Sequence, residues 1–85
     1  MDVWIVKDHE DQIVDVFKTV EGACAYLMAE LQRWHDEYPN DFDDYFLQAC
    51  RDIVLEDFVR EQSVIRAGIP DENFWLRAIK FEVKE

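Results

Sequence analysis

The chain has 85 residues, of which 20 are acidic and nine are basic, so its formal net charge is −11. Hydrophobic residues make up 49% of it, which is ordinary for a folded protein and too much for a disordered one. This size predicts one domain over residues 1–85, and this charge excludes direct binding to nucleic acid or to an anionic membrane.

Two short apolar runs open the chain, at residues 2–7 and 12–18. Both are rich in β-branched and aromatic residues, which is typical of strands. The polar residues 8–11 separate them and contain neither glycine nor asparagine. The pattern therefore predicts an antiparallel hairpin with a four-residue loop rather than a tight turn.

A helix is predicted to follow the hairpin and to end before Pro39. Thr19 has the residue type of a helix N-cap, and Glu21 places an acid in the first turn, where the helix dipole favours it. Apolar residues recur at intervals of three and four and form one stripe, at Val20, Cys24, Leu27, Leu31, Trp34 and Tyr38.

A second helix is predicted over residues 42–62, with Asn40 or Asp41 as its cap. Its apolar residues form two nearly opposite faces: Phe42, Tyr45, Phe46, Ala49, Cys50 and Ile53 on one, and Val54, Leu55, Phe58 and Val59 on the other. Two such faces have more to bury than one small sheet can cover. Either the helix bends, or one face packs in the core and the other meets a partner or a second copy of the chain.

The rest of the chain contains a stop signal and a last strand. Gly68, followed by Pro70, predicts the end of the helical region. Residues 63–65 fit either a last helical turn or a short extended piece. Residues 74–84 predict a strand with a buried face at Ile79, Phe81 and Val83 and a wet face at Lys80, Glu82 and Lys84. The expected fold is α+β: a three-stranded antiparallel sheet in the order ββααβ, with both helices on one face and the last strand beside the first.

No catalytic or metal-binding pattern stands out. Cys24 and Cys50 lie in apolar helical stretches and suit buried, reduced side chains, and the chain has only two glycines, too few for a phosphate loop. His9 lies in a polar loop, and His35 suits the C-terminal end of a helix dipole. We therefore expect no enzyme activity, no cofactor and no metal. The absence of a membrane-span-length apolar run and of a leader pattern predicts a cytoplasmic protein.

The segment that carries a functional hypothesis combines carboxylates with aromatic rings: Asp36, Glu37, Tyr38, Asp41, Phe42, Asp43, Asp44 and Tyr45. Anions beside flat rings offer what a basic nucleic-acid groove binds. In this hypothesis Tyr38, Phe42 and Tyr45 are the buried anchors of an interface. The same residues also suit a solvated turn and helix start, where aspartates are favoured by capping. Four more acids extend the negative surface along the second helix, namely Asp52, Glu56, Asp57 and Glu61.

A resemblance to known proteins adds to this hypothesis. Residues 16–23 read Val-Phe-Lys-Thr-Val-Glu-Gly-Ala, which looks like the Val-Phe-x-Ser/Thr-x-Glu-x-Ala stretch that joins a hairpin to its packing helix in small phage and prophage accessory proteins. The strongly acidic small domain is similar to DNA-mimicking anti-CRISPR proteins and to immunity proteins that block nuclease toxins. Neither family has a residue motif that transfers to this chain.

The resemblance and the charge together predict a phage-encoded inhibitor whose acidic surface blocks the nucleic-acid channel of a bacterial defence nuclease. Its partner is then a basic bacterial protein. One alternative is a homo-oligomeric accessory module that dimerises through the helix at 42–62, with the acids only keeping it soluble. Another is an immunity protein against a nuclease toxin.

Overall fold

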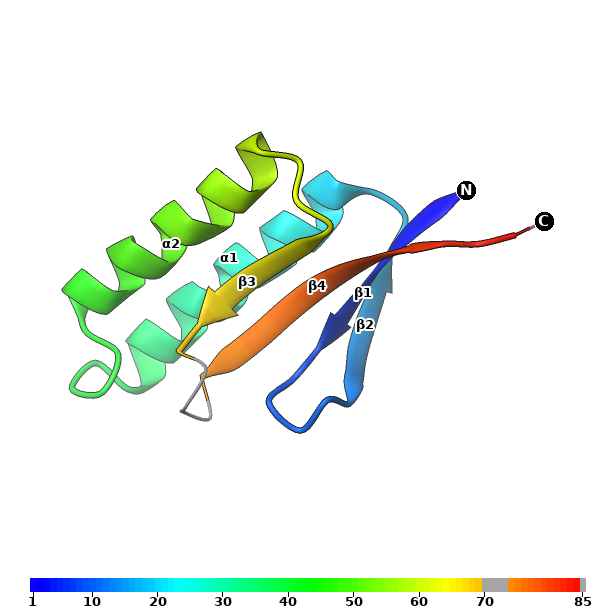
Figure 1. Cartoon of the computed structure of the whole chain (residues 1–85). Helices are drawn as coiled ribbons and strands as arrows, with labels where there is room; N and C mark the ends of the chain where they lie inside the picture. Colours follow the sequence, from blue (N-terminus) through cyan, green and yellow to red (C-terminus); the bar gives the residue numbers. More distant parts are fainter. Residues whose placement is uncertain (70–73, 85) are drawn as a thin grey trace.

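A four-stranded antiparallel sheet with both helices on one face makes up the part of the chain that the structure describes (Figure 1). The structure is a computed structural model and describes residues 1–69 and 74–84. Its elements are β1 (Asp2–Lys7), β2 (Ile13–Phe17), α1 (Val20–Glu37), α2 (Asp44–Val59), β3 (Val64–Gly68) and β4 (Trp75–Glu82). The strand order is β2-β1-β4-β3, so the last strand lies beside the first, as predicted.

The fourth strand, β3, is missing from the three-stranded prediction, which was wrong on this point. Of the two alternatives for residues 63–65, the extended one is confirmed, since β3 begins at Val64 and pairs with β4. Gly68 ends this strand and not a helix. Its φ of +103° suits glycine, and a Cβ there would lie 1.9 Å from the carbonyl oxygen of Phe74. Pro70 lies outside the described residues.

The helix α1 forms where the sequence predicts it. The Thr19 hydroxyl accepts a hydrogen bond from the Gly22 amide at 3.1 Å, which satisfies one of the unpartnered donors of the first turn. The helix ends at Glu37, just before Pro39. Its buried residues lie three or four apart and pack in the core: Ala23, Leu27, Leu31 and Trp34.

The helix α2 is shorter than the predicted span of 42–62, and its N-cap residue lies two positions after Asp41. Asp43, not Asn40 or Asp41, is the N-cap residue. Phe42 lies before the helix, in the turn that follows α1, and its ring is buried. Phe42, which the periodicity assigned to the helix, therefore belongs to the preceding turn, and α2 starts two residues later than predicted.

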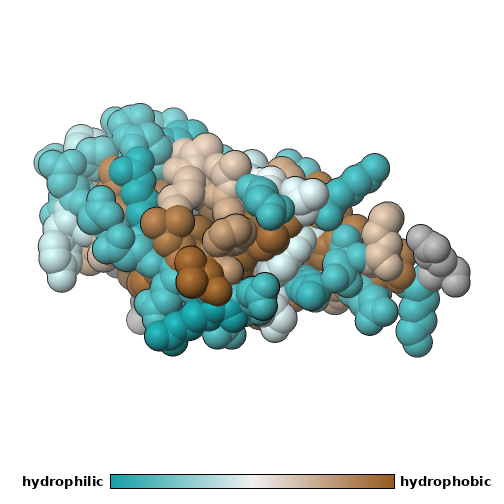
Figure 2. Space-filling model, turned by 90° about the horizontal axis from the view of Figure 1, so that it is seen from above, coloured by the Kyte–Doolittle hydropathy of each residue, from teal (hydrophilic) through white to brown (hydrophobic). Residues whose placement is uncertain are grey.

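The predicted excess of apolar surface on α2 is present. Leu47, Cys50 and Val54 are buried, but Leu55 is 52% exposed and Val59 is 75% exposed. Figure 2, which looks from above, shows apolar side chains gathered in the middle of this view with hydrophilic ones around them. The core thus accounts for only part of the apolar surface of this helix.

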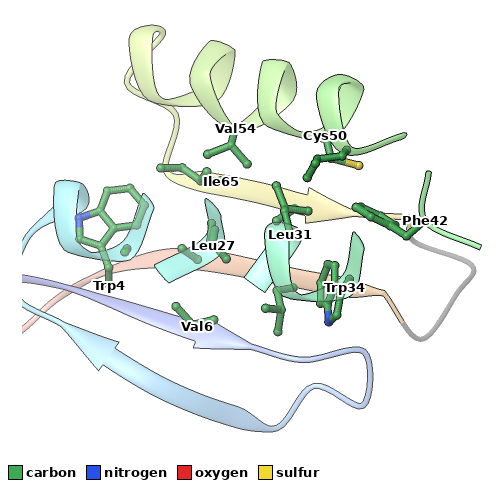
Figure 3. Close-up of a cluster of buried hydrophobic side chains, with 14 residues drawn as sticks. Trp4, Val6, Leu27, Leu31, Trp34, Phe42, Cys50, Val54 and Ile65 are labelled. Carbon is green, nitrogen blue, oxygen red and sulfur yellow. The ribbon is translucent and has the colours of Figure 1, made fainter. Parts of the chain in front are cut away.

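The hydrophobic core lies between the helices and one face of the sheet (Figure 3). Val6 from β1, Leu27 and Leu31 from α1, Val54 from α2 and Ile65 from β3 are each 0% exposed. Residues from strands and helices far apart in the sequence therefore share one buried layer, and the two helices are held on the sheet by the same contacts.

The face of β4 that packs against the core is the opposite of the one predicted from its sequence alternation. Leu76 and Ala78 are buried, whereas Phe81 and Val83 are exposed, and Ile79 is half-buried on the face away from the helices. Alternation gives the period of a strand, but it does not say which face the helices cover. The apolar residues predicted to be buried therefore lie on a sheet face without a described helix.

A buried carboxylate joins α2 to β3. Asp57, 4% exposed, accepts hydrogen bonds from the Arg66 amide at 3.1 Å and from its Nε and Nη2 atoms at 3.2 and 3.0 Å. The prediction that Asp57 adds to the negative surface was wrong. Burial alone would raise the pKa of this carboxyl, but the hydrogen bonds and the charge of Arg66 together lower the pKa below its ordinary value.

Candidate functional site

The residues predicted to form a binding segment lie at the end of α1, in the link that follows and at the start of α2. Figure 1 shows this region at one end of the molecule. Seven of the eight predicted residues are exposed, and we call them the acidic corner: Asp36, Glu37, Tyr38, Asp41, Asp43, Asp44 and Tyr45. The eighth, Phe42, is buried.

Phe42 is a core residue, and the prediction that it anchors a partner was wrong. Its side chain is 0% exposed, and its ring centroid lies 5.7 Å from that of Trp34 and 5.7 Å from that of Phe74. By contrast, Tyr45 is 76% exposed and Tyr38 is 47% exposed. Of the three predicted anchors, only the two tyrosines can meet another molecule.

Three carboxylates of the acidic corner cap a helix or pair with a histidine or an arginine. Asp43 caps α2 by accepting the Phe46 amide at 3.0 Å. Asp44 lies 3.0 Å from the Nε2 atom of His35, whose Nδ1 atom is 2.8 Å from a carbonyl oxygen of the turn. Glu37 pairs with Arg33 at 3.1 Å. Asp43 and Asp44 also lie at a helix start, where the dipole favours negative charge. Local structure therefore explains these two aspartates.

Asp36 and Glu37 occupy the last turn of α1, where the helix dipole disfavours negative charge. Asp36 accepts a hydrogen bond from the Gln32 amide group at 3.0 Å, which leaves its charge uncompensated by that contact. Asp41 forms no ion pair with any residue in the described ranges. Capping and the dipole do not account for these three acids, and the one ion pair they form within the described residues is that of Glu37 with Arg33.

A cleft of about 600 Å³ opens beside the acidic corner. Its described lining combines one carboxylate and one guanidinium with apolar and aromatic side chains: Arg33, Trp34, Tyr38, Asp41, Phe46, Ile69 and Phe74. A planar cation such as a guanidinium group stacks on aromatic rings and pairs with a carboxylate. Tyr38, Phe46 and Asp41 therefore offer rings and a carboxylate to an arginine side chain of another protein, and the Arg33 guanidinium in the same lining is already paired with Glu30 and Glu37.

Sequence reasoning missed two walls of this cleft. Phe46 was placed on one of the two apolar helix faces and outside the binding segment, yet it is 40% exposed and lines the cleft. Phe74, predicted as the start of the last strand, lies with its ring centroid 5.4 Å from that of Tyr38. Thirty-six positions separate Tyr38 from Phe74 in the printed sequence, and only the folded chain brings them together. No local signal could have found this contact.

The two thiols do not have the surroundings of a catalytic nucleophile. Burial raises the pKa of Cys50, and burial together with the charge of Glu21 raises the pKa of Cys24. A reactive cysteine needs the opposite shift, toward the thiolate. Neither cysteine is therefore a candidate for nucleophilic chemistry.

Comparisons with protein-family models, curated proteins and solved structures find no match for this chain. In residues 1–69 and 74–84, no helix has both the length and the apolar character needed to cross a bilayer. No three histidine, cysteine, aspartate or glutamate side chains of these same ranges gather where they could hold a metal ion. The acidic corner and its cleft are the candidate site that the geometry offers.

The density of negative charge predicts that salt stabilises this fold. Raising the ionic strength from about 0.01 M to 0.15 M shortens the Debye length from about 30 Å to about 8 Å and screens repulsion between carboxylates. We expect the melting temperature to rise by about 4–8 °C, corresponding to roughly 1 kcal/mol. Circular dichroism melting at several salt concentrations measures this, and a flat melting temperature would contradict the prediction.

Proposed function

We propose that this protein is an inhibitor that binds a basic, nucleic-acid-binding protein through the acidic corner. The observation that carries the proposal is that the acids and both tyrosine rings of this short segment are exposed, and that Asp41 and Tyr38 line one cleft. A groove that binds nucleic acid neutralises phosphates with arginine and lysine and stacks bases on flat side chains. Carboxylates beside exposed rings are complementary to both features.

The partner class that we propose is a bacterial defence nuclease, with the inhibitor encoded by a phage and acting in the cytoplasm of the host cell. The support is the net charge of −11 in one small chain. Anti-CRISPR DNA mimics and immunity proteins are likewise small and strongly acidic. A nuclease of either system holds its substrate in a basic channel. The acidic corner would occupy that channel and exclude the nucleic acid.

Charge and rings have different tasks in this proposal. The carboxylates speed association by steering the two proteins together, and their effect falls as salt is added. The binding energy comes from desolvated aromatic anchors, which are Tyr38, Tyr45 and Phe46 in the folded protein. An arginine of the partner would enter the cleft, stack on Tyr38 or Phe46 and pair with Asp41.

An affinity capture from bacterial lysate tests this function. The immobilised protein should retain a basic nucleic-acid-binding protein that moderate salt releases and that added duplex DNA displaces. The triple variant Asp36→Asn, Glu37→Gln, Asp41→Asn should then associate with the purified partner at least about tenfold more slowly at low salt. It leaves the Asp43 cap intact and changes only the exposed contacts of Glu37 with Arg33 and of Asp36 with Gln32, which contribute little to stability.

The matched control removes the same number of charges elsewhere, by Glu21→Gln, Glu61→Gln and Glu82→Gln. Glu21 and Glu61 line one pocket at the start of α1 and the end of α2, the opposite ends of the helices from the acidic corner. Association of this control should slow far less. Equal slowing in the two variants, or a captured protein that DNA does not displace, would contradict nucleic-acid mimicry by the corner.

A further inference from the structure

The sheet face opposite the helices carries a continuous apolar patch. Ile5 lies opposite Val16 on one side and Ile79 on the other, and Ile79 lies opposite Val64, so one row of apolar side chains crosses all four strands. The next row pairs Val3 with Phe81. We call these six residues the outer sheet face. Figure 1 shows that α1 runs behind the sheet in that view and that no described helix lies in front of it.

The composition of the outer sheet face is that of a covered surface. An antiparallel sheet with one wet face normally alternates apolar residues inward with polar residues outward. Here Val16 is 50% exposed, Phe81 is 43% exposed and Val64 is 38% exposed, and none of the six residues is polar. In β4, Ile79 and Phe81 alternate with charged residues in the pattern typical of burial. A contiguous apolar patch of this kind marks an interaction site.

The charges around this patch favour a second copy of the chain as its occupant. The row beside it is basic, with Lys7, Arg66 and Arg77 at paired positions. Asp11 pairs with both Lys7 and Arg77, and Asp57 pairs with Arg66, so the charge of this row is largely neutralised. Two copies can approach here without bringing carboxylate clusters together.

The apolar patch over the helices offers no such approach. Leu55 and Val59 are exposed on α2, but Asp52, Glu56 and Glu61 are exposed on the same helix or just after it. Two copies that met through α2 would place these acids opposite one another, and like charges across an interface are costly. The charge distribution therefore favours a dimer through the sheet face. The sequence had instead suggested a dimer through the second helix.

Each edge strand of the sheet has one backbone amide that a carboxylate covers. The edge strand β2 has an irregularity in its pairing with β1, and the carboxylate of Asp15 accepts the Val16 amide at 2.8 Å. At the other edge, Asp57 accepts the Arg66 amide of β3. Bulges, charged side chains and covered amides are the devices by which sheets avoid edge-to-edge association. These features disfavour edge-to-edge pairing and leave the face of the sheet as the better surface for a second copy.

We propose that this protein forms a two-fold homodimer in which the outer sheet faces of two copies stack on each other. Face-to-face sheets pack about 10 Å apart with interdigitating side chains. Four strands about 4.8 Å apart and about five residues long cover roughly 19 Å by 17 Å, which is about 320 Å² per copy. The total of about 650 Å² is the size of a small, transient interface, so we expect a weak dimer. The inference does not depend on the proposed inhibitor function.

Sedimentation velocity on the full chain tests the dimer. The protein should sediment as a dimer at about 100 μM, and Phe81→Lys or Val16→Lys should raise the dissociation constant at least about 100-fold, because each lysine enters a two-fold interface twice. The control Leu55→Lys adds the same charge to an exposed helix position and should leave the dimer intact. A monomeric wild-type protein, or dissociation by Leu55→Lys alone, would overturn the proposal.

A second measurement uses the unaltered protein, so that it stands even where a lysine variant fails to fold. Nuclear Overhauser effects between isotope-labelled and unlabelled copies in a mixed sample report contacts between chains. The proposal requires such contacts among the methyl groups of Val16, Val64 and Ile79. Intermolecular contacts from Leu55 and Val59 instead, or none, would overturn it.

Discussion

The Phe42→Ala variant is expected to lose about 3–5 kcal/mol of folding stability, as truncations of buried phenylalanines do. The ring is fully buried between Trp34 and Phe74, so its removal leaves a cavity that the short link between the helices has little room to close. Each kcal/mol lowers the melting temperature of a domain of this size by roughly 4–8 °C. We therefore expect a fall of at least about 12 °C by circular dichroism melting.

The matched control for this prediction is Tyr45→Ala. Tyr45 lies three residues further on and is 76% exposed, so its melting temperature should stay within about 2–4 °C of the wild-type value. Partner binding should respond in the opposite order, with the folded Tyr45→Ala protein losing affinity because an anchor ring is gone. Comparable melting of the two variants would show that Phe42 is not the core residue described.

The burial of Phe42 and the exposure of Tyr45 show how much of the site could be predicted from the sequence. Seven of the eight predicted residues do lie on the surface at one corner, because they follow one another closely in the chain. Which ring turns inward depends on the turn after Pro39, where the Phe42 amide donates to the Tyr38 carbonyl oxygen at 2.8 Å. That turn packs against Phe74, which lies just before β4, and a contact between residues so far apart in the sequence leaves no mark on the local pattern.

The fold, like the site, could be predicted from the sequence only where the signals are local. The helix α1 and the hairpin follow from Thr19, Pro39 and two apolar runs, all of which are local signals. The strand β3 has only five residues and follows α2 closely, so its apolar residues continue the helical pattern. It is a strand because β4 pairs with it, and the burial of Ile65 and Ala67 then decides which face turns inward.

The Asp57→Asn variant is expected to lose about 2 kcal/mol at neutral pH, the value for hydrogen bonds to a charged group. The carboxylate accepts three hydrogen bonds from Arg66, and asparagine keeps its size but removes its charge. The loss stays below that of a buried ion pair broken in the interior, because the Arg66 side chain is 57% exposed and water can solvate it. Urea unfolding measures the difference. Asp52→Asn, on the exposed side of the same helix, should change stability by less than about 0.5 kcal/mol.

The same pair predicts how this difference depends on pH. The pKa of Asp57 is lower in the folded protein than in the unfolded chain, so its contribution is fully present above the unfolded value of about 4 and is lost as the pH falls through the folded value. Between pH 7 and 5 the stability gap between wild type and Asp57→Asn should stay constant, and below pH 4 it should shrink. A gap that is unchanged down to pH 3 would contradict a role for the charge of Asp57, whereas a shrinking gap assigns the stabilisation to the ionised carboxylate and its hydrogen bonds from Arg66.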